Sequence, residues 1–114
     1  MDTKIERYRQ ALIKIMDGYA NTPSLNPLPD DETVFVCDEK NDHYILHRIG
    51  WQETKRIWNT PLYVRIRNGK FYVEIDWTED GIANELISVG LSKDDIVLAF
   101  QHPSVRPMTD FAIA

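Results

Sequence analysis

The fold is decided by the stretch Leu62-Tyr63-Val64-Arg65-Ile66-Arg67-Asn68-Gly69-Lys70-Phe71-Tyr72-Val73-Glu74-Ile75-Asp76-Trp77. β-branched and aromatic residues, which favour strands, flank Asn68-Gly69 on both sides. Asn-Gly is the preferred pair for a two-residue type I′ turn, because both turn residues need a positive φ. The stretch therefore predicts a β-hairpin that reverses at this turn.

A two-residue turn also sets which side chains face each other across the hairpin. One face is apolar and is predicted to be core: Ile66 opposite Phe71, Val64 opposite Val73, and Leu62 opposite Ile75. The other face carries Tyr63 opposite Glu74, Arg65 opposite Tyr72, and Arg67 opposite Lys70. We expect a sheet that is packed on one side and wet on the other.

The first half of the chain predicts one helix and a second hairpin. Apolar side chains recur at steps of three and four from Ile5 to Tyr19, which lines one face of a helix. Thr33–Cys37 and His43–Ile49 are rich in β-branched and aromatic residues, and the polar turn 38–42 separates them. These two segments are predicted to pair as a hairpin.

The second half predicts a shorter helix after Trp77, with Thr78 as its N-cap and Gly90 at its C′ position. The segment 96–100 is predicted as a turn leading into a short strand, and the chain from His102 as extended. The fold class that follows is α+β. We expect an antiparallel β-sheet of two consecutive hairpins, packed by the N-terminal helix and the helix in the C-terminal half.

At 114 residues the chain fits one domain, spanning 1–114. Its longest apolar runs fall far short of the roughly 20 residues that cross a bilayer, so no membrane association is expected. The mixed charges of Met1–Arg7 are unlike a secretory signal, which favours a cytoplasmic location. Cys37 is the only cysteine and is expected to be a free, buried thiol.

Two groups of side chains are candidates for sites of chemistry. His43 and His47 share a strand face, and Cys37 or an acid on the neighbouring strand could complete a metal site with them. Further ligands are missing, however, and both histidines can edge a packed face. A Cys–His nucleophile pair lacks an orienting third group. Glu74, Asp76, Glu79 and Asp80 are reminiscent of a magnesium site, although helix capping accounts for the last two. We expect no enzyme activity and no cofactor.

A partner-binding surface is the stronger functional prediction. The register exposes a set of tyrosines and arginines, residue types that are enriched at interface hot spots: Tyr63, Arg65, Arg67 and Tyr72. The alternative is direct DNA binding through Arg65, Arg67 and Tyr72. A formal net charge of −5 opposes a duplex-sized contact with phosphates, so any nucleic-acid contact is expected to be weak or indirect. Hairpins can also expose a strand edge, which predicts a homo-oligomer.

Five short motifs run along the chain: Tyr8-Arg9-Gln10, Asp42-His43-Tyr44 followed by Gly50-Trp51, Gly81-Ile82-Ala83-Asn84-Glu85-Leu86, Lys93-Asp94-Asp95-Ile96-Val97-Leu98-Ala99-Phe100, and Asp110-Phe111-Ala112-Ile113-Ala114. In their order and spacing the chain resembles the XisI family, the cyanobacterial fdxN-element excision controlling factors.

The resemblance implies a role in developmentally controlled excision of a DNA element. A separate site-specific recombinase cuts and rejoins the strands, and a member of this family assists or regulates. The resemblance also implies a companion, an XisH-like protein related to restriction-type nucleases, as the first partner. It implies no active-site residues, and the system served by this chain does not follow from the family.

Overall fold

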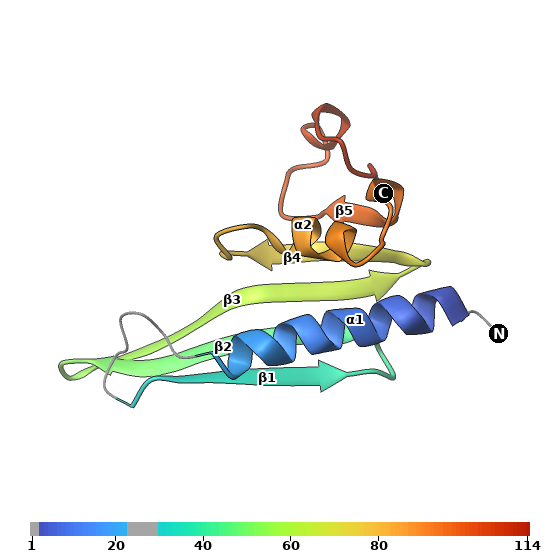
Figure 1. Cartoon of the computed structure of the whole chain (residues 1–114). Helices are drawn as coiled ribbons and strands as arrows, with labels where there is room; N and C mark the ends of the chain where they lie inside the picture. The colour runs from blue at the N-terminus through green and yellow to red at the C-terminus, as the bar shows by residue number, and fades with distance from the viewer. Residues whose placement is uncertain (1–2, 23–29) are drawn as a thin grey trace.

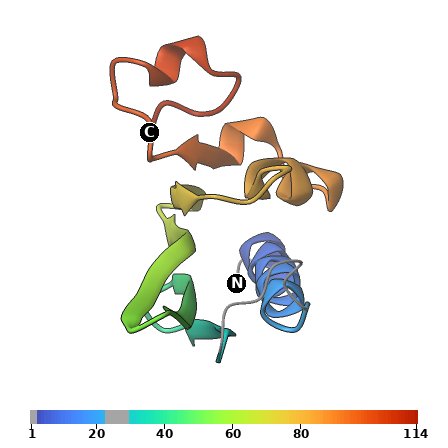
Figure 2. The ribbon, with the colours of Figure 1, turned by 90° about the vertical axis from the view of Figure 1, so that its left-hand side faces the viewer.

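The computed structural model describes residues 3–22 and 30–114, which form one five-stranded sheet with two α-helices on one of its faces (Figures 1 and 2). The elements are α1 (Thr3–Ala20), β1 (Glu32–Asp38), β2 (His43–Gln52), β3 (Lys55–Arg67), β4 (Lys70–Asp76), α2 (Ile82–Ser88), β5 (Ile96–Leu98), and the 3-10 helices Lys93–Asp95 and Arg106–Met108. The strand order is β1-β2-β3-β4-β5. The first four strands run antiparallel and β5 runs parallel to β4. The predicted α+β class is confirmed.

The core lies between the two helices and the sheet face that they cover. Helix α1 buries one stripe at helical spacing, which matches the predicted helix. The buried side chains that share this core are Tyr8, Leu12, Met16, Tyr44, Leu46, Leu62, Val64, Ile66, Phe71, Val73, Ile82, Ala83, Leu86, Leu91 and Ile96. Among the residues that the structure describes, no helix is both long and apolar enough to cross a membrane.

The hairpin turn is as predicted, with a φ of 52° at Asn68 and 76° at Gly69. Near the turn the register is confirmed, since Ile66 pairs with Phe71 and Val64 with Val73. Arg65 opposite Tyr72 and Arg67 opposite Lys70 are confirmed as well.

Farther from the turn, two predicted pairs are wrong. The register shifts between Tyr63 and Val64, so Tyr63 lies opposite Ile75 and Leu62 opposite Asp76. The expected pairs were Leu62 with Ile75 and Tyr63 with Glu74. The reason is a β-bulge: β4 inserts Glu74 as one extra residue against β3, which no turn rule foresees.

The bulge turns Asp76 toward the helical side of the sheet, where it caps α2. Its Oδ2 accepts a hydrogen bond from the Ile82 N–H at 2.8 Å, and its Oδ1 accepts from the Thr78 N–H. The prediction that Thr78 is the N-cap is therefore wrong, because α2 begins only at Ile82, after Gly81. At the other end Gly90, with a φ of 114°, takes the predicted C′ position.

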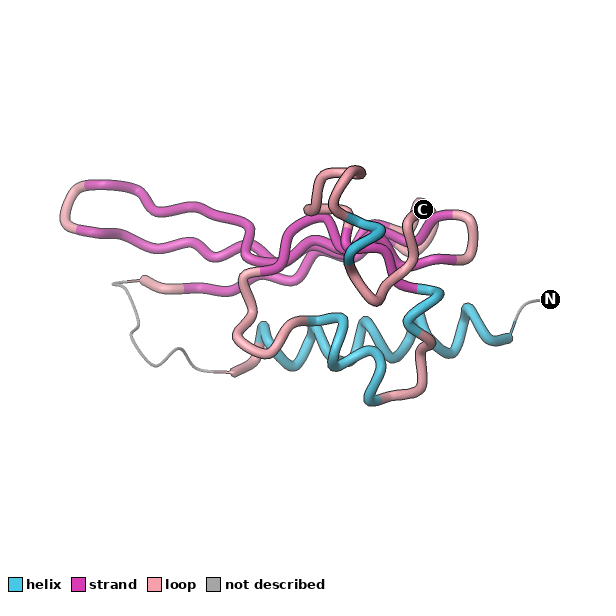
Figure 3. Tube along the Cα trace, turned by 90° about the horizontal axis from the view of Figure 1, so that it is seen from above, coloured by secondary structure: helices cyan, strands magenta, loops and turns pink. Residues whose placement is uncertain are grey.

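Strands β2 and β3 form a longer hairpin than the sequence indicated. The stretch Lys55–Thr60, for which no strand was predicted, belongs to β3, and Glu53 and Thr54 make the reversal. A second register irregularity lies between Leu46 and Arg48. The distal part of this hairpin extends past the end of α1 (Figure 3).

The strand predicted within 96–100 is confirmed as β5, but the segment after His102 is not extended. The Arg106 guanidinium donates to the backbone carbonyls of Gln101 and Ala99 at 3.0 and 3.1 Å, which folds the segment into a closed loop. After this loop, Ala112 forms a parallel β-bridge with Val97 of β5. The Arg106 side chain thus supplies hydrogen bonds to backbone carbonyls that a neighbouring strand would supply to an extended tail.

Candidate partner-binding site

Helices α1 and α2 lie on one side of the sheet (Figure 2). By the strand register, the opposite face gathers all four residues predicted to contact a partner. Tyr63, Arg65 and Arg67 come from β3 and Tyr72 from β4. Arg65 lies directly opposite Tyr72, and the Arg67 guanidinium lies 5.6 Å from the centroid of the Tyr72 ring. We call this side of the sheet the open face.

Two of the four side chains already have partners within the chain. Arg65 Nε donates to Glu74 Oε2 at 3.1 Å, and both side chains are partly buried, so much of the Arg65 charge is compensated. The Tyr63 hydroxyl and His43 Nδ1 lie 2.8 Å apart. The open face is therefore less basic than its arginine count indicates.

The sequence alone did not reveal an apolar row that crosses the open face. Cross-strand pairing places Val36 beside Ile45, Ile45 beside Tyr63, and Tyr63 beside Ile75, so that four strands contribute one side chain each. Val36, at the edge, is 43% exposed. We call these residues the open-face row. The strand order and the Glu74 bulge create it, and neither follows from local sequence.

The distal hairpin adds aromatic surface to the same face. Trp58 lies opposite Ile49 and is 63% exposed, and its Nε1 is 3.4 Å from His47 Nδ1. The Arg56 guanidinium lies 4.8 Å from the Trp51 ring. Two of the three tryptophans thus border the open face at the end that projects beyond α1.

The histidines do not assemble a metal site. His47 Nδ1 lies 3.0 Å from the Thr60 hydroxyl, as His43 lies beside Tyr63. Within residues 3–22 and 30–114, no group of three or more His, Cys, Asp or Glu side chains has metal-binding geometry. Glu79 and Asp80 precede α2 rather than joining Asp76 in a cluster.

Cys37 corrects an expectation, since the thiol predicted to be buried is exposed at the end of β1. Partial burial of the sulfur and the nearby carboxylates of Glu39 and Asp38 raise the pKa of the Cys37 thiol. The thiolate is therefore disfavoured, which opposes a nucleophilic role.

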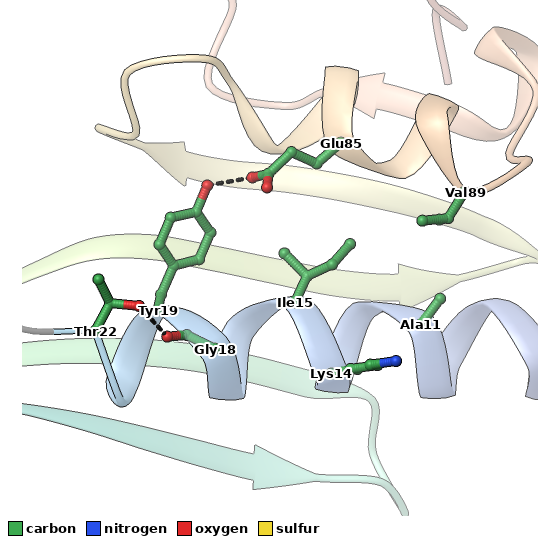
Figure 4. A pocket seen from close by; sticks show the side chains of 8 residues that line it. All are labelled: Ala11, Lys14, Ile15, Gly18, Tyr19, Thr22, Glu85 and Val89. Atoms are coloured by element: carbon green, nitrogen blue, oxygen red, sulfur yellow. Dashed lines mark hydrogen bonds between the residues drawn. The ribbon is translucent and has the colours of Figure 1, made fainter.

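A hollow lies between α1 and α2, on the side of the molecule opposite the open face (Figure 4). Its volume is about 600 Å³, within the range of ligand pockets. The residues that line it are Ala11, Lys14, Ile15, Gly18, Tyr19, Thr22, Glu85 and Val89. The Tyr19 hydroxyl donates to the Glu85 carboxylate across the hollow. Burial, together with this carboxylate, raises the pKa of Tyr19 above its ordinary value. None of these residues was predicted as a site.

Two of the motifs that carry the family resemblance meet in space. Arg9 Nε and Nη2 donate to the two carboxylate oxygens of Asp42 at 2.8 and 3.2 Å, and the Tyr44 hydroxyl donates to Asp42 at 2.6 Å. Tyr8 Oη donates to the carbonyl of Gly90 at 3.0 Å. These motif residues therefore tie α1 to the sheet and to the end of α2, which is a structural role.

Comparison with known proteins gives one family over almost the whole chain. A family model described as XisI protein matches residues 1–113. The crystal structure of the fdxN element excision controlling factor XisI from Anabaena variabilis ATCC 29413 is 36% identical, with a TM-score of 0.83, over 97% of this chain and 99% of that one. An XisI-like protein from the same organism is 28% identical, with a TM-score of 0.85, over 97% and 100% of the two chains.

A curated relative of another kind matches only locally. Malpinin synthetase from Mortierella alpina is 32% identical in an alignment 89 residues long that covers 72% of this chain. The chain spans about 1% of that protein's length. The match therefore gives no ground for carrying over the activity of the synthetase.

Proposed function

Since the chain belongs to the XisI family, we propose that it is a non-catalytic controlling factor for programmed excision of a DNA element. The observation that carries the proposal is the 36% identity to a solved fdxN element excision controlling factor over nearly all of both chains. Two candidate catalytic carboxylates have structural partners, which supports a non-catalytic role: Asp76 caps a helix and Glu74 pairs with Arg65.

The factor acts in the cytoplasm through protein–protein contacts. Its partners in this proposal are an XisH-like protein, related to nucleases, and the site-specific recombinase that performs the strand exchange. The open face supports this mode of action, since an apolar row flanked by tyrosine and arginine has the composition of an interface centre.

Direct DNA binding is the weaker alternative. Arg67 stacked beside Tyr72 resembles the cation and aromatic pairs that hold single strands, which favours it. The pairing of Arg65 with Glu74 and the net charge of −5 oppose it, because both reduce the attraction for phosphates.

Co-expression with the XisH-like protein, followed by size-exclusion chromatography, tests the proposal. We expect the two proteins to elute together at roughly micromolar concentration. Val36→Lys places a charge at the exposed end of the open-face row and should weaken the complex at least tenfold. Gln52→Lys, at the hairpin tip, is the matched control and should leave the complex intact.

Separate elution of the two wild-type proteins would count against the proposal. A gel shift at low salt examines the alternative, because phosphate contacts are strongest there. Tight binding of DNA that Arg67→Ala abolishes would favour the DNA-binding function instead.

A further inference from the structure

We propose that the outer edge of β1 is a strand-addition site, which takes a basic β-strand of a partner protein. This inference rests on the proposed function, in that it assumes a protein partner, and it names the element and the chemistry of the contact. Strand β1 lies along one edge of the sheet, beyond β2 (Figure 1). Of the strands that the structure describes, only β2 pairs with it, so the second row of β1 backbone N–H and C=O groups faces outward.

The edge has the geometry that strand pairing needs. All seven residues of β1 pair with β2 in one continuous register, from Glu32 opposite Ile49 to Asp38 opposite His43. The β2–β3 and β3–β4 pairs each contain a register shift. Prolines, lysines and bulges commonly block an exposed edge, and β1 contains none of them. The backbone of β1 is therefore open to a further strand.

The side chains of β1 alternate between the two faces of the sheet. Phe35 packs against the core on the helical side, whereas Val34 and Val36 lie on the open face. Glu32 and Asp38 share that face with the valines, one at each end of the strand. An added strand therefore meets the pattern acid, apolar, apolar, acid on the open face. Two apolar side chains at its centre would extend the open-face row.

Charge decides which strand can add at this edge. Residues 30–40 contain five carboxylates and one cation, in the order Asp30, Asp31, Glu32, Asp38, Glu39 and Lys40. Asp31 pairs with Arg48 at 3.0 Å, and the remaining charges leave both ends of β1 negative. A strand with Lys or Arg opposite Glu32 and Asp38 gains two favourable cross-strand pairs. The same negative charge opposes contact with nucleic-acid phosphates.

A second copy of β1 is the poorer occupant, because it carries the same charges. When two copies pair antiparallel over all seven residues, Glu32 lies opposite Asp38 twice. Like charges directly opposite each other are destabilising, whereas a basic strand meets the same two positions with the opposite charge. The acidic ends of β1 therefore select a partner strand over self-pairing.

A cyclic hairpin peptide gives a test that needs no natural partner. Its outer strand is Lys-Thr-Ile-Thr-Ile-Thr-Lys, which places a lysine opposite each acidic end of β1 and an isoleucine opposite each valine. Cyclisation orders the strand before binding, which lowers the entropic cost of association. The full chain is titrated into the labelled peptide at concentrations where the chain sediments as a monomer. We expect saturable fluorescence anisotropy, and a peptide with Glu in place of both lysines should bind at least tenfold more weakly.

Amide hydrogen exchange, followed by NMR, locates the bound peptide. In an antiparallel ladder alternate residues direct their N–H groups to opposite edges, so every second amide of β1 faces outward. These amides should exchange quickly in the free chain and at least tenfold more slowly when the peptide is saturating. The β1 amides that already donate to β2 should change much less.

The double variant Glu32→Gln, Asp38→Asn should weaken binding of the peptide about fivefold, because both cross-strand charge pairs are lost. The same substitutions favour the pairing of two copies, so the two kinds of occupant respond in opposite directions. The double variant Glu53→Gln, Glu79→Gln changes the net charge equally at exposed positions away from β1 and should leave peptide binding unchanged. Thermal melts establish that both variants fold.

Four results would each overturn the inference: no binding of the lysine peptide, equal binding of the glutamate peptide, slowed exchange at amides other than those of β1, or a wild-type dimer along β1 at micromolar concentration. The last result would assign the edge to a second copy. If the XisH-like protein elutes with the chain and leaves the outward amides of β1 unprotected, the inference fails while the proposed function stands. If that protein elutes separately while the lysine peptide protects β1, the proposed function fails and the strand-addition site stands.

Discussion

Asp42 connects the first helix to the sheet through one carboxylate. It sits at the end of the β1–β2 turn with a φ of 58°, and both of its oxygens accept hydrogen bonds from Arg9. Burial raises the pKa of Asp42, but the hydrogen bonds from Arg9 and Tyr44 outweigh burial and hold it below its ordinary value. A carboxyl with a lowered folded-state pKa stabilises the fold above its unfolded pKa, and this stabilisation is lost as the pH falls through the folded value.

Asp42→Asn is therefore expected to lower the free energy of unfolding at neutral pH by about 2 kcal/mol, because Arg9 loses its charged partner outside α1 and keeps Glu6 on its own helix. Asparagine accepts the positive φ, so the backbone should not change. As the pH falls below about 4, the unfolded-state value, the wild type progressively loses the same interaction, and the two stabilities should approach each other. Urea unfolding at pH 7 and pH 3 measures this, and a difference that is constant with pH would contradict the assignment.

The partly buried side chain of Asp76, on β4, also decides how the next helix begins. Because the bulge turns Asp76 to the helical side, Asp76→Ala should leave the Ile82 N–H without its acceptor and cost about 1 to 2 kcal/mol. Asp80→Ala, an exposed carboxylate of the same loop, is the control and should change stability by less than about 0.5 kcal/mol. Chemical denaturation of the two variants decides between Asp76 and the local sequence pattern as the origin of the cap.

At the scale of the element, the hairpin turn is the feature that the sequence predicts best. Gly69→Ala forces a side chain onto a φ of 76°, and we expect a loss of about 1 to 2 kcal/mol. A Cβ there meets no neighbour, so the cost comes from the backbone alone. Asn68→Asp keeps a residue that tolerates positive φ and should cost much less. Equal stabilities of the two variants in thermal melts would rule out the type I′ interpretation.

Local sequence does not predict the features of this fold that depend on contacts between residues far apart in the chain. The pairs nearest Asn68-Gly69 follow from the turn, but the bulge at Glu74 does not, because it depends on Asp76 meeting a helix six residues later. The four residues predicted to contact a partner do share one face. The open-face row could not be predicted because it depends on the strand order. The hollow between the helices could not be predicted either, because it forms only when α2 is placed beside α1.

At the scale of the whole molecule, the chain offers two surfaces on opposite sides of one sheet. The helices cover one side and form the hollow between α1 and α2, and the open-face row crosses the other side. Two of the motifs on which the family resemblance rests lie between them, where Arg9 and Asp42 fix α1 on the sheet. Because the two surfaces lie on opposite sides of the sheet, a molecule bound at one does not block the other.

Self-association through the sheet edge stays a prediction. Strand β1 is an edge strand of the sheet, and in the described part of the chain it pairs with β2 alone. If two copies pair antiparallel with Phe35 opposite Phe35, their apolar faces remain on the same side and Glu32 lies opposite Asp38. Like charges directly opposite each other oppose pairing, so the wild type should form only a weak dimer at neutral pH.

The double variant Glu32→Gln, Asp38→Asn removes both repulsive pairs of this dimer. At roughly 0.5 kcal/mol for each of two pairs, dimerisation should strengthen about fivefold. Asparagine at 38 retains an oxygen for the Lys40 and Asn41 N–H groups, so the turn should survive. The double variant Glu53→Gln, Glu79→Gln changes the net charge equally, away from the edge, and serves as the control.

Sedimentation velocity over a concentration series gives the dissociation constants. Because the repulsion acts only in this register, equal constants for the two double variants would show that the copies do not meet along β1.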